Sequence, residues 1–154
     1  MTRHRLPAVL LLLLALAGCV APSLPPGVRP TLAAQWIDAG GKLRWPPHQG
    51  FADAPVFVVL PEGLLIDRFG SLAGHFFSPK GASYSARALP YVCAAQPYAS
   101  YQVLRPLPAW VGKAAAWFRE PGGATQFETD ASAASLLADH TIAPLSEAGS
   151  PPCN

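Results

Sequence analysis

The chain has 154 residues, the length of a single domain. Charged residues make up 13% of it, about half the usual share, and it carries 18 prolines and 13 glycines. Because proline and glycine interrupt helices, and helical bundles and coiled coils need charged outer faces, this composition argues against both classes. A hydrophobic content of 51% supports a packed core and argues against disorder over most of the chain.

Residues 1–18 have the pattern of an export signal. Arg3, His4 and Arg5 form a positive start, and an unbroken apolar run follows over residues 10–17. This run is too short for a permanent membrane span and is typical of a cleaved secretory peptide. The sequence Leu16-Ala-Gly-Cys19 resembles a bacterial lipobox, in which Cys19 becomes the first mature residue and carries diacylglycerol. The alternative is an ordinary signal peptide, cleaved near Ala21, that discards Cys19.

Lipid chains on Cys19 would hold the protein on a membrane surface of the cell envelope without spanning the membrane. Val20, rather than aspartate, follows the cysteine and suits the outer membrane of a cell with two membranes. Removing residues 1–18 takes two arginines from the 11 basic residues, which leaves nine basic and nine acidic residues. A neutral chain without a cluster of lysine and arginine lacks the surface that nucleic acid requires, so we expect no nucleic-acid partner.

Two cysteines, Cys93 and Cys153, remain after lipidation of Cys19. In an oxidising compartment an even pair predicts a disulfide, which would close a loop of about 60 residues and tie the C-terminal tail. Two free thiols are the alternative. No histidine or further cysteine lies at ligand spacing, so we expect no metal site.

The mature chain divides into three parts. Residues 19–54 are interpreted as a lipid-attached, proline-rich tether followed by an irregular lead-in, with a semi-rigid spacer over 20–31. Residues 55–148 form the folded domain, and residues 149–154 form the C-terminal tail.

Short apolar runs between turn residues predict strands at Val56–Leu60, Leu64–Phe69, Gly74–Phe77, Tyr101–Arg105 and Thr125–Glu128, with a further one at Ala115–Phe118. One helix is predicted over Ala131–Asp139, with Asp130 as its N-cap. Several strands and one late helix indicate a compact, sheet-dominated α+β domain with few helices.

Several motifs in fixed order carry a family resemblance. They are Leu60-Pro-Glu-Gly-Leu-Leu-Ile-Asp-Arg-Phe-Gly70, Gly74-His-Phe-Phe-Ser-Pro-Lys-Gly81, Arg87-Ala-Leu-Pro90, Gln96-Pro-Tyr98, Tyr101-Gln-Val-Leu-Arg-Pro-Leu-Pro108, Trp117-Phe118 and Pro121-Gly-Gly-Ala-Thr-Gln-Phe127. Together, over roughly residues 55–145, they resemble the tuberculosis necrotizing toxin domain family. The resemblance implies a fold distantly like ADP-ribosyltransferases and hydrolysis of NAD to ADP-ribose and nicotinamide. NAD is then the substrate, no cofactor is implied, and an immunity protein is left open as a partner.

The resemblance also implies roles for individual residues. Arg68 and Arg87 match its arginine motifs and would hold the pyrophosphate, which suits the bidentate fork of arginine. Gln126 matches the catalytic glutamine and would orient a water or a ribose hydroxyl, because an amide donates and accepts at once. Phe69 would stack on a ring. Each also has a structural interpretation, as a loop-bracing arginine or a core phenylalanine.

Glu128 lies two residues after Gln126 and therefore on the same face of a strand. The pair resembles the Gln-x-Glu of some ADP-ribosyltransferases, and Glu128 could stabilise developing positive charge. An exposed strand glutamate without a function is the alternative.

One position departs from the family. The family usually has Tyr-His-x-Tyr where this chain has Tyr98-Ala-Ser-Tyr101, so Ala99 takes the place of a functional histidine. Alanine cannot titrate, which predicts weakened catalysis unless another group, such as Ser100 or His75, compensates. Three functions stay open: an envelope NAD glycohydrolase, an ADP-ribosyltransferase, and a non-catalytic lipoprotein that binds a nucleotide or a protein.

Overall fold

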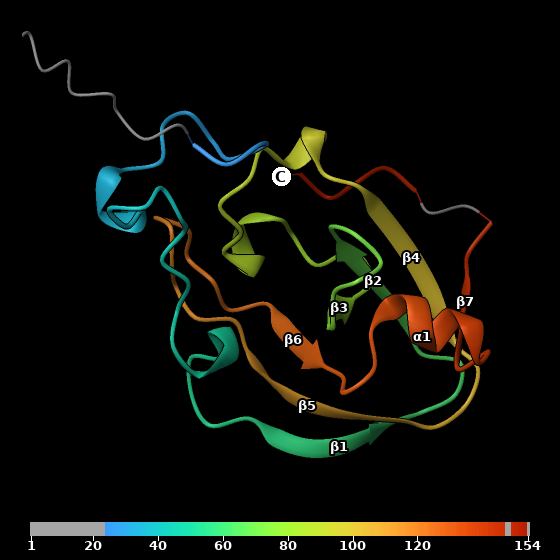
Figure 1. Cartoon of the computed structure of the whole chain (residues 1–154). Helices are drawn as coiled ribbons and strands as arrows, with labels where there is room; N and C mark the ends of the chain where they lie inside the picture. The colour runs from blue at the N-terminus through green and yellow to red at the C-terminus, as the bar shows by residue number, and fades with distance from the viewer. Residues whose placement is uncertain (1–23, 147–148, 154) are drawn as a thin grey trace, which may run out of the picture.

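The computed structural model describes residues 24–146 and 149–153, so the predicted export signal and Cys19 lie outside the described residues. Seven antiparallel strands form one strongly curved sheet in the order β1-β5-β6-β3-β2-β4-β7 (Figure 1). The elements are β1 (Val56–Leu60), β2 (Leu65–Phe69), β3 (Phe76–Pro79), β4 (Tyr98–Val103), β5 (Leu107–Lys113), β6 (Thr125–Glu128), α1 (Ala133–Ala138) and β7 (Ile142–Pro144). Four short 3-10 helices lie at Ala34–Trp36, His48–Gly50, Ser85–Arg87 and Cys93–Ala95. The predicted sheet-dominated α+β class is confirmed.

One face of the sheet builds the main core. Its buried members come from all seven strands and from α1, which contributes Ala133 and Leu136. The sheet contributes Leu60, Ile66, Phe77, Tyr101, Val103, Leu107, Ala109, Phe127 and Ile142. Because side chains alternate along a strand, the residues between these point to the other face. That other face carries most of the candidate site.

The predictions for β1, β2 and β6 agree with the structure to within one residue. The predicted strand Tyr101–Arg105 instead begins at Tyr98, because Tyr98 and Ala99 pair with the end of β2. The predicted strand Gly74–Phe77 begins later, at Phe76. The carbonyls of Gly74 and His75 accept hydrogen bonds from outside the sheet, from the backbone N–H groups of Ala133 and Thr129.

Two strands, β5 and β7, were not predicted. β5 begins between two prolines, at 106 and 108, but Pro108 has a partner strand on one side only: it pairs with β1, and β6 begins to pair at Trp110. Proline is tolerated where one side of a strand has no partner. The predicted strand at Ala115–Phe118 is wrong: Phe118 and Arg119 have φ of 53° and 62°, which makes a tight turn closed by a bridge from Trp117 to Glu120.

The helix is shorter than predicted. It begins after Ser132, whose Oγ accepts from the Ser135 N–H at 3.2 Å, so Ser132 and not Asp130 is the N-cap. The N–H groups of Ala133 and Ala134 donate to the carbonyls of Gly74 and Leu72, which docks the 70–75 loop against the helix start. No helix within the described residues has the length and apolar character needed to cross a bilayer.

Residues 24–51 pack on the domain rather than extending away from it. Val28 and Leu32, within or next to the expected spacer, are buried with Phe118 in a second cluster. The ring of Trp36 lies 4.9 Å from that of Trp117, and Arg29 forms an ion pair with Glu120. The expectation of a segment with little to bury therefore does not hold for this part of the chain.

Candidate active site

Asp67 is the centre of a buried polar network on the face of the sheet opposite the main core. Its side chain has no exposed surface, and Oδ1 accepts from Arg87 Nη2 at 2.5 Å. Oδ2 accepts from the Gly81 N–H at 2.8 Å and from the Tyr98 hydroxyl at 2.7 Å. A buried carboxylate is tolerated only when it is paired and hydrogen-bonded, and Asp67 meets both conditions.

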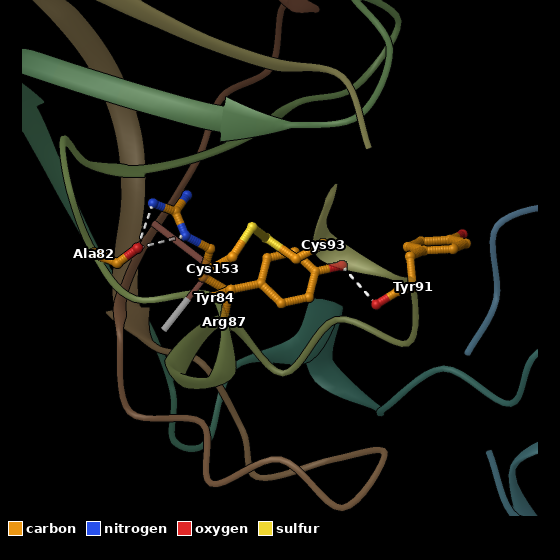
Figure 2. The surroundings of a disulfide bond; sticks show 6 residues. All are labelled: Ala82, Tyr84, Arg87, Tyr91, Cys93 and Cys153. Carbon is orange, nitrogen blue, oxygen red and sulfur yellow. Dashed lines mark hydrogen bonds between the residues drawn. A yellow bond between two sulfur atoms is a disulfide. The ribbon is translucent and has the colours of Figure 1, made fainter. Parts of the chain in front are cut away.

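Arg87 lies over an aromatic ring at this network. Its Cζ lies 5.1 Å from the centre of the Phe69 ring, a cation–π distance. Nε and Nη2 also donate to the Ala82 carbonyl, at 3.0 and 2.8 Å (Figure 2). Nη1 makes no hydrogen bond to any described residue. The guanidinium is thus held rigidly while one nitrogen keeps donors for a ligand.

The disulfide stabilises the turn that carries Arg87. Cys93 and Cys153 are joined, with Cα atoms 5.7 Å apart, as the cysteine count predicted (Figure 2). Beside it, the Tyr84 N–H donates to the Pro152 carbonyl at 2.8 Å, and the Tyr84 ring lies 4.8 Å from that of Phe69. The Tyr84 hydroxyl donates to the Tyr91 carbonyl, and burial raises the pKa of Tyr84 to about 12. The C-terminal tail therefore fixes the turn that carries Arg87.

Gln126 and Glu128 lie on β6, beside a pocket of about 450 Å³. The pocket is lined by His48, Gln49, Phe51, Pro55, Trp110, Glu128 and Asp130. Gln126 is connected to this lining through Gln49, whose backbone carbonyl accepts from Gln126 Nε2 at 3.0 Å. The described residues lining the pocket include two carboxylates and no lysine or arginine, so the pocket favours a cation.

Glu128 has no salt-bridge partner among the described residues. Burial raises the pKa of its carboxyl; nearby His75 lowers that pKa, and Asp130 raises it further. His75 itself is held through Nδ1 by the Thr129 carbonyl at 3.0 Å. An uncompensated, half-buried carboxylate at a pocket is suited to stabilising positive charge on a ligand.

Strand register shows which residues share a face. Asp67 lies opposite Ser78 on β3 and Ser100 on β4. Phe76, two residues before Ser78, lies opposite Glu128 on β6. Because residues two apart in a strand point the same way, the Asp67 network and the Gln126–Glu128 pair lie on one face. Phe69 and Ser100 lie on that face too.

Arg68 and Ala99 lie on the other face. They are cross-strand partners, and Ala99 packs against the main core. Arg68 lies beneath the 70–75 loop with 5% of its surface exposed and its Cζ 5.4 Å from the Phe77 ring. A Cβ added to Gly74 would lie 2.0 Å from Arg68 Nη2, so the loop backbone touches the guanidinium.

Arg68 is incompletely paired. Its Nε and Nη1 are buried and meet no hydrogen-bond partner among the described residues. Desolvation lowers the pKa of Arg68, and Tyr101 opposes this shift. Buried donors without partners are rare in folded proteins and call for an explanation such as an absent anion.

The structure therefore brings together Phe69, Arg87, Ser100, Gln126 and Glu128 on one face, and it sets Arg68 and Ala99 on the opposite face.

Sequence reasoning missed Asp67, although it adjoins Arg68 in the same motif, because a single acidic residue gives no signal of its partners. It also assigned nothing to His48, whose place in the pocket depends on how the lead-in folds. No cluster of three metal-ligating side chains occurs in the described part of the chain.

Comparisons with known proteins show which sequences this chain resembles. Residues 59–145 match the family model described as tuberculosis necrotizing toxin. The conidial surface nicotinamide adenine dinucleotide glycohydrolase of Aspergillus fumigatus is 36% identical over 124 residues, which cover 72% of this chain. The chain spans about half, 53%, of the length of that relative.

The fold is also similar to a solved structure. Tuberculosis necrotizing toxin, in complex with its immunity factor, superposes with a TM-score of 0.58 at 19% identity, covering 70% of this chain and 65% of that one. This likeness concerns the fold. With the family match over more than half of its residues, the chain belongs to the tuberculosis necrotizing toxin family.

Proposed function

We propose that this protein is an NAD glycohydrolase, which splits the nicotinamide–ribose bond of NAD to give nicotinamide and ADP-ribose. One observation carries the proposal: Glu128 lines a pocket on the same face of the sheet as Arg87, and Gln126 is hydrogen-bonded to Gln49, which also lines that pocket. Neighbouring strands lie about 4.8 Å apart, so β2 and β6, with β3 between them, are roughly 10 Å apart. A dinucleotide can span that distance.

The charges of the face set the direction in which NAD would bind. Arg87, with its free Nη1, suits the negatively charged pyrophosphate. The pocket at Trp110, Glu128 and Asp130 joins an aromatic ring to two carboxylates, which suits the cationic nicotinamide ring. Phe69 would then stack near Arg87, toward the pyrophosphate end.

Cleavage of the nicotinamide–ribose bond requires mainly that the protein position the reactants and stabilise positive charge. The bond between ribose C1′ and the nicotinamide nitrogen breaks with its electron pair moving to the ring, which leaves as neutral nicotinamide. Positive charge develops on the ribose, and the Glu128 carboxylate would stabilise it. Gln126 would orient the water whose oxygen bonds to C1′ and whose proton passes to solvent. Ala99 offers no titratable group beside Arg68, its cross-strand partner on the core face, so we propose a turnover below that of relatives with histidine there.

Arg68 would act differently from Arg87. It lies on the core side, and its two unpartnered N–H groups could reach a phosphate only where the 70–75 loop moves aside. We therefore propose Arg87 as the main anchor, with Arg68 as a second anion ligand at the end of β2.

We further propose that the protein works from a membrane surface, held by lipid on Cys19. Replacing Cys19 with serine should release the protein to the soluble fraction or block its processing. Continued labelling of Cys19→Ser with palmitate would reject this anchor without affecting the proposed chemistry.

The deciding experiment incubates the purified mature protein, solubilised in detergent, with NAD and separates the products by HPLC. Free ADP-ribose and nicotinamide in equal amounts support hydrolysis. Release of nicotinamide with ADP-ribose attached to protein would instead indicate a transferase that uses Gln126 and Glu128, which share a strand face. If neither free nor protein-attached ADP-ribose forms, the result would support a non-catalytic binding protein.

A further inference from the structure

The turn formed by residues 46–51, called here the lead-in turn, is fixed to the end of β5. Phe51 is buried, and its ring packs directly on Gly112. A Cβ added to that glycine would lie only 2.7 Å from Cδ1 of the ring, so the close contact requires glycine. On either side of Phe51, the Ala52 N–H donates to the Lys113 carbonyl and the Ala115 N–H donates to the Gly50 carbonyl, both at 2.8 Å. These contacts hold the turn directly over Gln126, which pairs with Gly112.

The lead-in turn has an unusual backbone. His48, Gln49 and Gly50 follow one another with φ of 54°, 55° and 81°. Two successive non-glycine residues in the left-handed region cost free energy, and such a conformation persists only where surrounding contacts impose it. Here it turns the Gln49 carbonyl toward Gln126.

The consequence is a fixed orientation for the Gln126 amide. Nε2 donates to the Gln49 carbonyl at 3.0 Å. The amide also lies close to Gly50, because a Cβ added to that glycine would be 3.7 Å from Nε2. An amide has two N–H donors and one acceptor oxygen. With one donor committed to Gln49, the other donor and Oε1 have no hydrogen-bond partner among the described residues.

We infer that the Gln49 backbone carbonyl is a positioning group for the reaction: it orients Gln126 so that Oε1 accepts a hydrogen bond from the attacking water. This inference rests on the proposed NAD glycohydrolase function. It extends the site beyond the part of the chain that matches the family model, which begins at residue 59. The lead-in would thus belong to the catalytic site and not to a tether.

Backbone preference gives a matched pair of variants. Gln49→Val and Gln49→Gly both remove the side chain, but valine resists the left-handed conformation and glycine adopts it readily. Gln49→Val should lower kcat for NAD about tenfold, the loss expected when one hydrogen bond is broken, with KM nearly unchanged. Gln49→Gly should rescue most of that loss. Arg119→Val, at a left-handed residue of the Trp117–Glu120 turn, controls for backbone strain.

A double-mutant cycle separates positioning from general damage. In a Gln126→Ala background, Gln49→Val should cause no further loss of kcat, because the group that it positions is gone. Equal losses in both backgrounds, or equal kcat for the valine and glycine variants, would overturn the inference. Should Gln49→Val fail to fold, Gly50→Ala repeats the test, since alanine also resists a φ of 81°.

One readout does not depend on activity. The side-chain amide signals of Gln126, measured by nitrogen–proton NMR of the intact protein, should shift in Gln49→Val and not in Arg119→Val. A wild-type protein that leaves NAD intact would reject the proposed function, whereas unshifted Gln126 signals in an active protein would reject the role of Gln49 alone.

Discussion

The two ends of the candidate site are held in different ways. At one end, Arg87 is fixed by groups within the matched domain: it pairs with fully buried Asp67, lies over Phe69 and donates to the Ala82 carbonyl. At the other end, Gln126 is fixed by a backbone carbonyl of the lead-in turn. The proposed phosphate ligand thus lies on a 3-10 helix and is anchored to β2, while the proposed catalytic amide is oriented by a segment from outside the matched domain.

Both ends are braced by segments outside the matched residues 59–145. The C-terminal tail, tied by the disulfide, supports Tyr84 and through it the turn of Arg87. The lead-in turn supports Gln126. This comparison predicts that damage to the tail affects substrate binding, whereas damage to Gln126 affects turnover.

The largest effect is expected for Arg87→Ala. It leaves the Asp67 charge buried without a cation, which should lower the free energy of unfolding by about 3–5 kcal/mol and raise KM for NAD. Urea denaturation and steady-state kinetics measure both. Adding Asp67→Asn should recover part of the stability and none of the NAD binding. Unchanged stability in the single variant would contradict the role of this buried pair.

Gln126→Ala should reduce kcat roughly 100- to 1000-fold with little change in KM, as expected for a group that acts mainly in the transition state. Thr125→Ala is the matched control, because Thr125 is the neighbouring residue on β6 and points to the other face. A Gln126→Ala variant that loses affinity for NAD but keeps its turnover would assign Gln126 to binding and remove the contrast between the two ends.

Cys153→Ser should lower the free energy of unfolding by about 2–4 kcal/mol, because the unfolded chain regains the freedom of a loop spanning 60 residues. We also expect KM to rise and kcat to stay near that of the wild type, since Gln126 does not depend on the tail. Wild-type protein treated with a reductant should behave in the same way. An equal fall in kcat would show that the two ends are not braced separately.

The smallest effect concerns Glu128 and pH. Its raised pKa means that, above about pH 4.5, the native state holds this proton more tightly than the unfolded chain does. Stability of the wild type should therefore fall, relative to Glu128→Gln, as pH rises from 4 to 7. Thermal melts of both proteins across this range measure the difference. Parallel curves would show that Glu128 is more fully solvated than its place at the pocket implies.

Local sequence determined the elements whose signals are local. An unbroken apolar run ended by Pro61 marked β1, and a largely apolar segment closed by Gly70 marked β2. The motifs around Arg68, Arg87 and Gln126 carried the family resemblance. The cysteine pair was predictable because compartment and even count constrain it. By contrast, β5 was hidden by its own proline, whose tolerance depends on where β6 stops pairing.

Only the tertiary structure decided how the candidate residues group. Neighbours in one motif, Asp67 and Arg68, point to opposite faces, and strand register settles which of them shares a face with Gln126. The lead-in, which has no regular pattern, acquires its place from the burial of Phe51 on Gly112, more than 60 residues away. Contacts between distant segments depend on packing and register, which local composition does not encode, so the sequence indicated the family and the chemistry while the fold selected the residues that can act together.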